Sequence, residues 1–201
     1  MIGVVDETTP SVGAGVCYGL ISAVILADEA TARAAVRTAV PRERRRPFHW
    51  CREGPTARAR MIAAIEDVGV VGRAVVVPCG RRSQEAARAV ALAVTVPQLL
   101  DEGCDQLLIE ARTPAQDGRD RALILDLLHG HPSRPAYDWR KKGEELLWIA
   151  DAIGGAIHDH LRGLDDQWYE RMAKATGLVV EYRMLPAAET SPKSRQSRLP
   201  S

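Results

Sequence analysis

Short apolar runs alternate along the chain with longer stretches in which apolar residues recur at helical spacing. The runs are rich in Val, Ile and Leu and end at Gly, Pro or charged residues, as is typical of buried strands. The predicted strands cover residues 2–6, 15–26, 48–51, 73–77, 105–111, 134–140 and 178–183. The predicted helices cover residues 29–40, 54–67, 83–100, 117–128, 144–161 and 167–175. Strands that alternate with helices predict an α/β fold in which helices cover both faces of a mixed sheet.

A chain of 201 residues is long enough for one domain to bury its own core. We expect this single domain to span residues 1–185. From Pro186 onward the sequence holds Pro, Ser, Lys and Arg with few apolar residues. Residues 186–201 are therefore predicted to form a disordered C-terminal tail.

Composition and charge exclude only a few classes of protein. The formal net charge of +1 neither favours nor excludes an anionic partner, and the four cysteines lack the close spacing of a structural zinc site. No stretch reaches the roughly 20 apolar residues of a membrane span, and no N-terminal targeting segment is visible. We expect a cytoplasmic protein with reduced thiols and no membrane contact, and its oligomeric state stays open.

The most informative polar residue is Asp151. It is the only charged residue in the run LLWIADAIGGAI, from Leu146 to Ile157. A carboxylate buried without a partner costs several kcal/mol, so Asp151 needs a cation, a hydrogen-bonding cluster or water. At the other end of the chain, the apolar run 1–5 stops abruptly at Asp6 and Glu7. These two features predict one site built from both ends of the sequence.

Two further carboxylates lie next to predicted strands or helices. Glu110 is near the end of the strand predicted for residues 105–111, and Glu53 precedes the helix predicted for residues 54–67. If these residues converge near Asp151, charge repulsion disfavours the cluster unless a divalent cation neutralises it. Mg²⁺ and Mn²⁺ prefer oxygen ligands, and metal ions held by carboxylates suit phosphodiester cleavage.

Several segments together resemble the domain-of-unknown-function 3800 family, prokaryotic proteins with a ribonuclease H-like fold. Asp6-Glu7-Thr8 resembles the Asp-Glu-Ser end of the family's first strand, and Ala150-Asp151 with Gly155-Ala156 resembles its late helix. The segments PFHWCRE (47–53) and LLIEAR (107–112) resemble its middle and later strands. The resemblance covers about residues 1–161.

This resemblance implies a ribonuclease H-like mixed sheet and a divalent-metal-dependent nuclease or a related phosphoryl-transfer hydrolase. It implies that Asp6, Glu110 and Asp151 are catalytic residues and ligands of Mg²⁺ or Mn²⁺, with Glu53 as a further ligand. Two features depart from the family: Trp148 stands where many members have Gln, and the strand RAVVVPC ends without a carboxylate. A non-catalytic binding module is therefore the main alternative, and a small-molecule hydrolase is a third.

Each acidic candidate also has a purely structural interpretation. Asp6 could simply begin a turn, because Asp is favoured there. Asp151 could be a core carboxylate that accepts hydrogen bonds from neighbouring backbone amides. Glu110 could pair with Arg112, two residues along the same strand face. The sequence leaves these alternatives open.

Other polar residues carry weaker signals. Arg44, Arg45 and Arg46 lie in a basic loop and are the predicted nucleic-acid contacts, since such groups supply many of the contacts to phosphate. Solvated loop arginines are the alternative. Asp120 is explained by capping and dipole effects at the start of a predicted helix, and His158 is either a surface residue or a proton shuttle beside Asp151.

Overall fold

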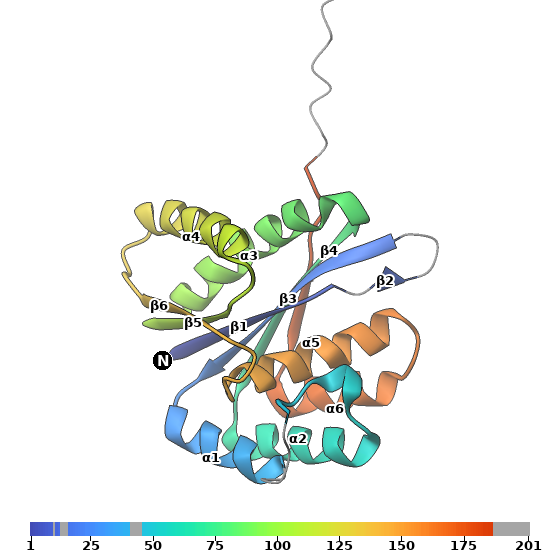
Figure 1. The fold of residues 1–201 in the computed structure, drawn as a ribbon. Helices are drawn as coiled ribbons and strands as arrows, with labels where there is room; N and C mark the ends of the chain where they lie inside the picture. The colour runs from blue at the N-terminus through green and yellow to red at the C-terminus, as the bar shows by residue number, and fades with distance from the viewer. Residues whose placement is uncertain (10, 13–15, 41–45, 187–201) are drawn as a thin grey trace, which may run out of the picture.

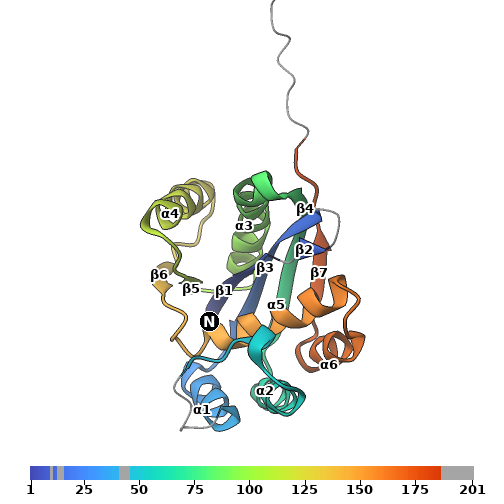
Figure 2. The same ribbon diagram turned by 45° about the vertical axis from the view of Figure 1, so that its right-hand side comes forward.

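The computed structural model describes residues 1–9, 11–12, 16–40 and 46–186, whose elements form three layers (Figures 1 and 2). The strands are β1 (Ile2–Thr8), β2 (Ser11–Val12), β3 (Val16–Leu26), β4 (Val71–Gly80), β5 (Gln106–Glu110), β6 (Ala136–Arg140) and β7 (Val179–Tyr182). Within the described residues they form one sheet in the order β6-β5-β1-β3-β4-β7, with β2 paired to β3 beside this path. β1 runs antiparallel to β3 and parallel to β5, so the sheet is mixed.

Helices cover both faces of this sheet (Figure 2). They are α1 (Glu29–Ala39), α2 (Pro55–Val68), α3 (Gln84–Asp101), α4 (Pro114–His129), α5 (Leu147–Leu161) and α6 (Asp166–Thr176), with 3₁₀ turns η1 (Trp50–Arg52) and η2 (Arg81–Ser83). One apolar core joins the sheet to α1, α2, α5 and α6, and a second joins its other face to α3 and α4. α5 lies directly against β1 and β3, which places the apolar helix noted in the sequence at the centre of the molecule.

The predicted α/β class is confirmed, as is the mixed sheet with helices on both faces. The strand predicted for residues 134–140 is also an edge strand, as expected. Among the described residues, no helix combines the length and the apolar composition needed to cross a bilayer. Except for Pro186, the predicted tail lies outside the described residues.

Two of the differences between the predicted and observed elements have a clear physical cause. The strand predicted for residues 48–51 is wrong, because the chain forms the 3₁₀ turn η1 here and the backbone N–H of Trp50 donates to the Asp151 side chain instead of to a neighbouring strand. The helix predicted to begin near residue 117 begins at Pro114. Thr113 and Gln116 form a capping box there, which satisfies backbone groups at the helix start.

Two adjacent glycines let α5 approach its neighbours closely. A Cβ atom on Gly154 would lie 2.6 Å from Thr8 Oγ1 and 2.9 Å from Ser22 Oγ, so this glycine packs against the sheet. A Cβ atom on Gly155 would lie 2.2 Å from Cγ of Trp50. Gly155 therefore packs against the η1 turn and not against the sheet.

We expect Gly155→Ala to destabilise the protein by about 1–3 kcal/mol, the usual cost of overpacking a core. Trp50 cannot move aside easily, because its Nε1 donates to Asp159 Oδ2 at 2.9 Å and its ring packs edge-on against Trp168. The measurement is the free energy of unfolding in urea. Gly118→Ala in α4 is the matched control, since nothing lies within 4 Å of its added Cβ, and it should stabilise by about 0.5–1 kcal/mol. Equal effects of the two substitutions would contradict the packing described for Gly155.

Candidate active site

Asp6 and Glu110 lie side by side because β1 and β5 are parallel neighbours. Val5 pairs with Ile109, so the residues that follow them on the two strands are also neighbours. Side chains alternate between the two faces of a strand. Val4 and Leu108 face the core that contains α5, and Asp6 and Glu110, two residues further along, face the same way. Only 4% of Asp6 and 5% of Glu110 is exposed.

Asp151 reaches the same place from α5. Its Oδ1 lies 2.8 Å from Nδ1 of His49, and its Oδ2 accepts the backbone N–H of Trp50 at 2.7 Å. Its side chain is 14% exposed. The carboxylate of Asp151 is therefore stabilised within the apolar helix by hydrogen bonds from His49 and from the Trp50 backbone N–H, both in the segment before α2.

All three carboxylates line one small pocket. It has a volume of about 20 Å³, enough for roughly one water molecule. Its lining consists of Asp6, Phe48, His49, Glu110, Lys142, Leu147, Trp148 and Asp151. The three acidic residues that the sequence singled out thus line one pocket, although they lie on β1, β5 and α5.

The pair of Asp6 and Glu110 has unusual electrostatics. Burial raises the pKa of Asp6 well above its ordinary value, and the hydrogen bond to Glu110 and the charges of Glu110 and Asp151 raise it further. Burial also acts to raise the pKa of Glu110, but the Asp6 carboxyl group and Lys142 outweigh burial and lower it. Of the two acids, Asp6 is therefore the one that holds a proton more readily, and Glu110 is the one that ionises more readily.

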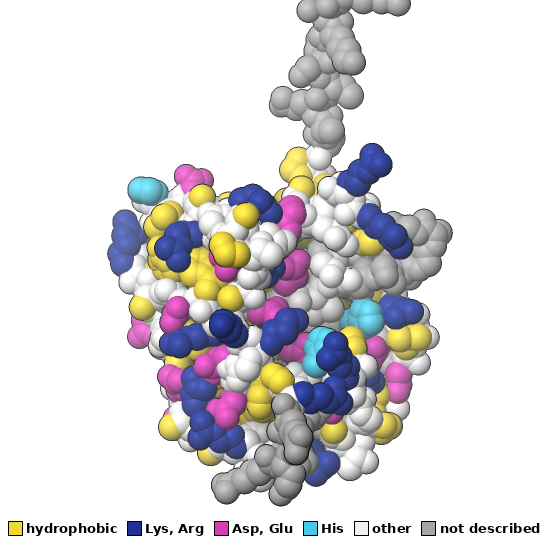
Figure 3. All heavy atoms as spheres, in the orientation of Figure 1, with side chains coloured by type: hydrophobic (Ala, Val, Ile, Leu, Met, Phe, Trp, Pro, Cys, Tyr) yellow, Lys and Arg dark blue, Asp and Glu magenta, His cyan; other side chains and the backbone are white. Residues whose placement is uncertain are grey.

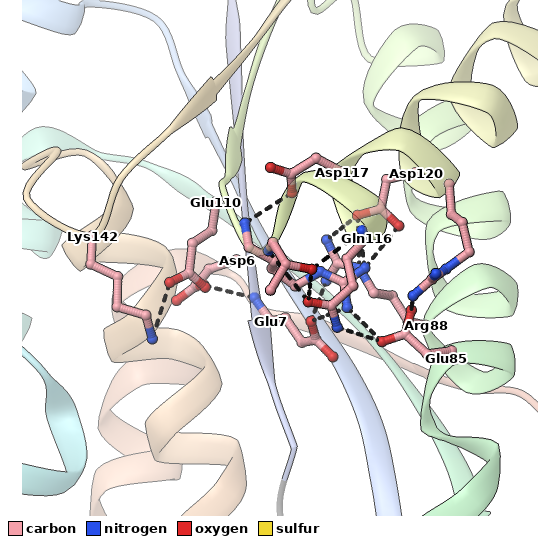
Figure 4. A network of polar contacts seen from close by, with 12 residues as sticks. Asp6, Glu7, Glu85, Arg88, Glu110, Gln116, Asp117, Asp120 and Lys142 are labelled. Atoms are coloured by element: carbon pink, nitrogen blue, oxygen red, sulfur yellow. Dashed lines mark hydrogen bonds and ion pairs between the residues drawn. The ribbon is translucent and has the colours of Figure 1, made fainter.

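Lys142 supplies the nearest cation. Its Nζ lies 3.0 Å from Glu110 Oε1, although 67% of the lysine side chain is exposed. The same buried Oε1 atom accepts no hydrogen bond of normal geometry from the described residues. Figure 4 shows Lys142 on one side of Asp6 and Glu110, with a second polar network on the other.

This second network lies on the opposite face of β1. The Glu7 side chain points away from Asp6, toward α3. Its Oε2 accepts a hydrogen bond from Nη1 of Arg88 at 2.7 Å. Arg88 is only 2% exposed and also donates to Asp120 Oδ2 through Nη2 at 2.8 Å. Arg112 donates to Asp120 as well, at 3.0 Å. The backbone N–H of Glu7 donates to Asp6 Oδ1 at 2.7 Å, so the network holds the end of β1 that carries Asp6.

Two structural interpretations of the sequence are corrected by these contacts. Glu110 does not pair with Arg112; its cation is Lys142, and Arg112 binds Asp120 and Glu85. Asp120 is not a helix cap, because α4 begins at Pro114 and the Asp120 side chain is buried against two arginines.

The remaining predicted site residues are less central. Glu53 is not among the residues that line the pocket; its Oε1 accepts the backbone N–H of His49 at 3.4 Å, and its role as a ligand stays a prediction. Arg46 is exposed and donates to the backbone oxygen of Arg52 at 3.2 Å. Arg44 and Arg45 lie outside the described residues.

His158 belongs to a different cluster beside the pocket. Its Nδ1 lies 3.3 Å from Asp159 Oδ1, and hydrogen bonds to Asp159 and Cys51 raise its pKa to about 9. Asp159 Oδ2 also accepts a hydrogen bond from Arg58 Nη1 at 2.9 Å. His158 does not line the pocket, so this arrangement favours a structural role for it over that of a proton shuttle.

The acidic groups fit a divalent cation in part. In the ranges that the structure describes, no three His, Cys, Asp or Glu side chains are arranged as ligands of a common ion. Asp6 and Glu110 nevertheless offer adjacent buried carboxylates, with one Glu110 oxygen short of a hydrogen bond. This donor set suits Mg²⁺ or Mn²⁺, and Asp151 would be the third ligand if its carboxylate turned from His49 toward the pair.

Sequence reasoning missed His49 and Lys142 as partners of the carboxylates. His49 lies in the segment 47–53 that carries the resemblance, but nothing local showed that it contacts Asp151, 102 residues away. Lys142 precedes α5 in a short charged loop and carries no sequence signal that distinguishes it from Lys141. Both contacts depend on tertiary structure alone.

No protein-family model and no curated protein matches the sequence. Among solved structures, the chain is similar to ribonuclease HII from Archaeoglobus fulgidus, in its complex with PCNA. The identity is 12% and the TM-score 0.48, and the match covers 88% of this chain and 78% of that chain. At this level of similarity no residue role passes from that enzyme to this chain.

Proposed function

We propose that the protein is a divalent-metal-dependent phosphoryl-transfer hydrolase, and specifically a nuclease, whose catalytic residues are Asp6, Glu110 and Asp151. One observation carries the proposal: three carboxylates from distant parts of the chain line one pocket, and two of them are almost fully buried side by side. Placing like charges together in a protein interior is unfavourable. Such an arrangement suits a site that binds a cation.

In this proposal Asp6 and Glu110 are the first ligands of Mg²⁺ or Mn²⁺. A bound divalent ion would supply an activated water and stabilise charge on the phosphoryl oxygens. The chain's own groups set the conditions for this chemistry. The Glu7 N–H orients the Asp6 carboxylate, and His49 and the Trp50 N–H orient Asp151.

Nucleic acid is the proposed substrate because the pocket would bind a phosphodiester through a metal ion. Figure 3 shows Lys and Arg side chains scattered among acidic ones on the face that it draws, without one continuous basic patch. Substrate binding would therefore depend on local contacts near the pocket more than on long-range attraction. Arg44, Arg45 and Arg46 remain the proposed phosphate contacts.

A second candidate function is a non-catalytic binding module. It is favoured by the contacts of Glu110 with Lys142 and of Asp151 with His49 and Trp50, because these partners stabilise both carboxylates without a metal ion. The two functions differ in their response to metal. Ions that bind the folded state raise its melting temperature, so a nuclease should show a rise with Mn²⁺ and a metal-free module should not.

The direct test is a cleavage assay on single- and double-stranded DNA, RNA and RNA–DNA hybrids with Mn²⁺, Mg²⁺ or a chelator. We expect cleavage of at least one of these substrates that needs the metal and is lost in Glu110→Gln and Asp151→Asn. Asp138→Asn is the matched control, because this exposed carboxylate lies on β6 and pairs with Arg140 outside the pocket. Cleavage that persists in chelator, or that persists in both Glu110→Gln and Asp151→Asn, would contradict the proposal.

A further inference from the structure

The position of Lys142 points to a role beyond a surface ion pair. It lies in the loop between β6 and α5, and its ammonium group lies 3.0 Å from a carboxylate that is 5% exposed. Most surface lysines meet exposed acids, where an ion pair contributes little. Here an exposed, flexible side chain places its charge on the buried pair formed by Asp6 and Glu110.

We propose that Lys142 is a built-in competitor of the metal ion: its ammonium group neutralises Glu110 in the metal-free protein and must leave before a divalent cation binds. This inference rests on the proposed function, since it concerns the same carboxylates. It assigns Lys142 a regulatory role, in which the affinity of the site for metal depends on how readily the lysine departs.

The chemistry of the contact supports an exchange of cations. The ammonium group is a compact charge on a flexible stem, and it takes the side of Glu110 that faces the pocket. Glu110 Oε1 is buried and receives no hydrogen bond of normal geometry from the described residues. Lys142 is the cation paired with this oxygen, and the Asp6 carboxyl group is the other contact that stabilises the Glu110 carboxylate. A divalent cation would replace one positive charge with two at the same oxygen.

The surroundings leave room for the departing side chain. A second hollow of about 370 Å³ adjoins the pocket, and Glu110 and Lys142 line both. Glu7, Glu85 and Arg112 also line this hollow. Because 67% of Lys142 is already exposed, moving its ammonium group into the hollow removes little packing and costs little desolvation.

The test compares Mn²⁺ binding to wild type, Lys142→Met and Lys142→Arg. Binding is measured from the rise in melting temperature with Mn²⁺ concentration and, independently, by titration calorimetry. We expect Lys142→Met to bind Mn²⁺ about tenfold more tightly than wild type, because the competitor is gone, and Lys142→Arg to stay within about threefold of wild type. A melting transition in the absence of metal shows that each variant is folded.

Lys141→Met is the matched control. It changes the net charge equally at the neighbouring exposed position, so it measures the general electrostatic effect of losing one lysine. We expect its affinity for Mn²⁺ to stay within about twofold of wild type. Equal affinities of wild type and Lys142→Met, or equal gains in the two Met variants, would overturn the competitor role while leaving the proposed nuclease intact. If neither wild type nor Lys142→Met responds to Mn²⁺, both proposals fail.

Discussion

Arg88→Met should lower the free energy of unfolding by about 3–5 kcal/mol, the usual effect of removing one partner from a buried ion pair. Arg88 is 2% exposed and binds Glu7 and Asp120, which come from different layers of the fold. Met fills a volume similar to that of Arg. The decrease in the free energy of unfolding therefore measures the cost of leaving the Glu7 and Asp120 carboxylates without their main cation. Arg112 also contacts both acids, which places the expected loss near the lower end of this range.

The measurement is urea denaturation followed by circular dichroism. Arg119→Met is the matched control: this arginine is exposed and pairs with Glu85 at 3.1 Å, so its removal should cost less than about 1 kcal/mol. Adding Asp120→Leu to Arg88→Met should recover part of the loss, because neighbouring substitutions in one network are not additive. A cost below about 1 kcal/mol for Arg88→Met would show that Glu7 and Asp120 do not depend on this cation.

The same network bears on the candidate site. Glu7 lies next to Asp6, and the two side chains point to opposite faces of β1, as the period of a strand requires. Arg88 holds the Glu7 side chain on one face, and the Glu7 backbone N–H holds the Asp6 carboxylate on the other. A loss at Arg88 should therefore also weaken any response of the protein to Mn²⁺.

Much of the fold could be predicted because local patterns and tertiary structure agree. Consecutive valines mark β4, and the apolar sequence around Asp151 marks a helix most of whose residues are buried. The segment 48–51 could not be predicted in this way. Its aromatic and apolar residues favour a strand, but the Asp151 side chain accepts the Trp50 N–H that a neighbouring strand would need, and the chain turns instead.

The acidic residues of the candidate site could be predicted from the sequence, but their partners in loops could not. Asp6 and Asp151 could be selected from the sequence alone, because each is an acidic residue in apolar surroundings. Their partners could not, because Lys142 and His49 lie in charged or irregular segments whose position depends on long-range packing. Arg88 was hidden for a similar reason: it lies in a helix rich in Ala and Val, and its partner Asp120 is 32 residues away.

Asp6→Asn should have opposite effects on activity and on stability. Loss of a metal ligand should reduce cleavage by at least about 10³-fold, because metal coordination contributes several kcal/mol to the transition state. In the absence of metal, however, the variant should melt a few degrees higher than wild type at pH 7. Burial raises the pKa of Asp6, so ionising it in the folded state is unfavourable, whereas the Asn amide is neutral and can still donate to Glu110.

The pH dependence follows from the direction of that shift. The folded protein keeps the Asp6 proton at pH values where the unfolded chain has released it, so this residue makes stability fall as pH rises from about 4 to its raised native pKa. Below about pH 4 both states hold the proton, and the advantage of Asn should disappear. Melting temperatures of wild type and Asp6→Asn between pH 3.5 and 8, measured in chelator, test this. A difference in melting temperature that stays constant across that range, or a variant less stable than wild type at pH 7, would mean that Asp6 is not held protonated beside Glu110. The unfavourable carboxyl pair that motivates the metal site would then be absent.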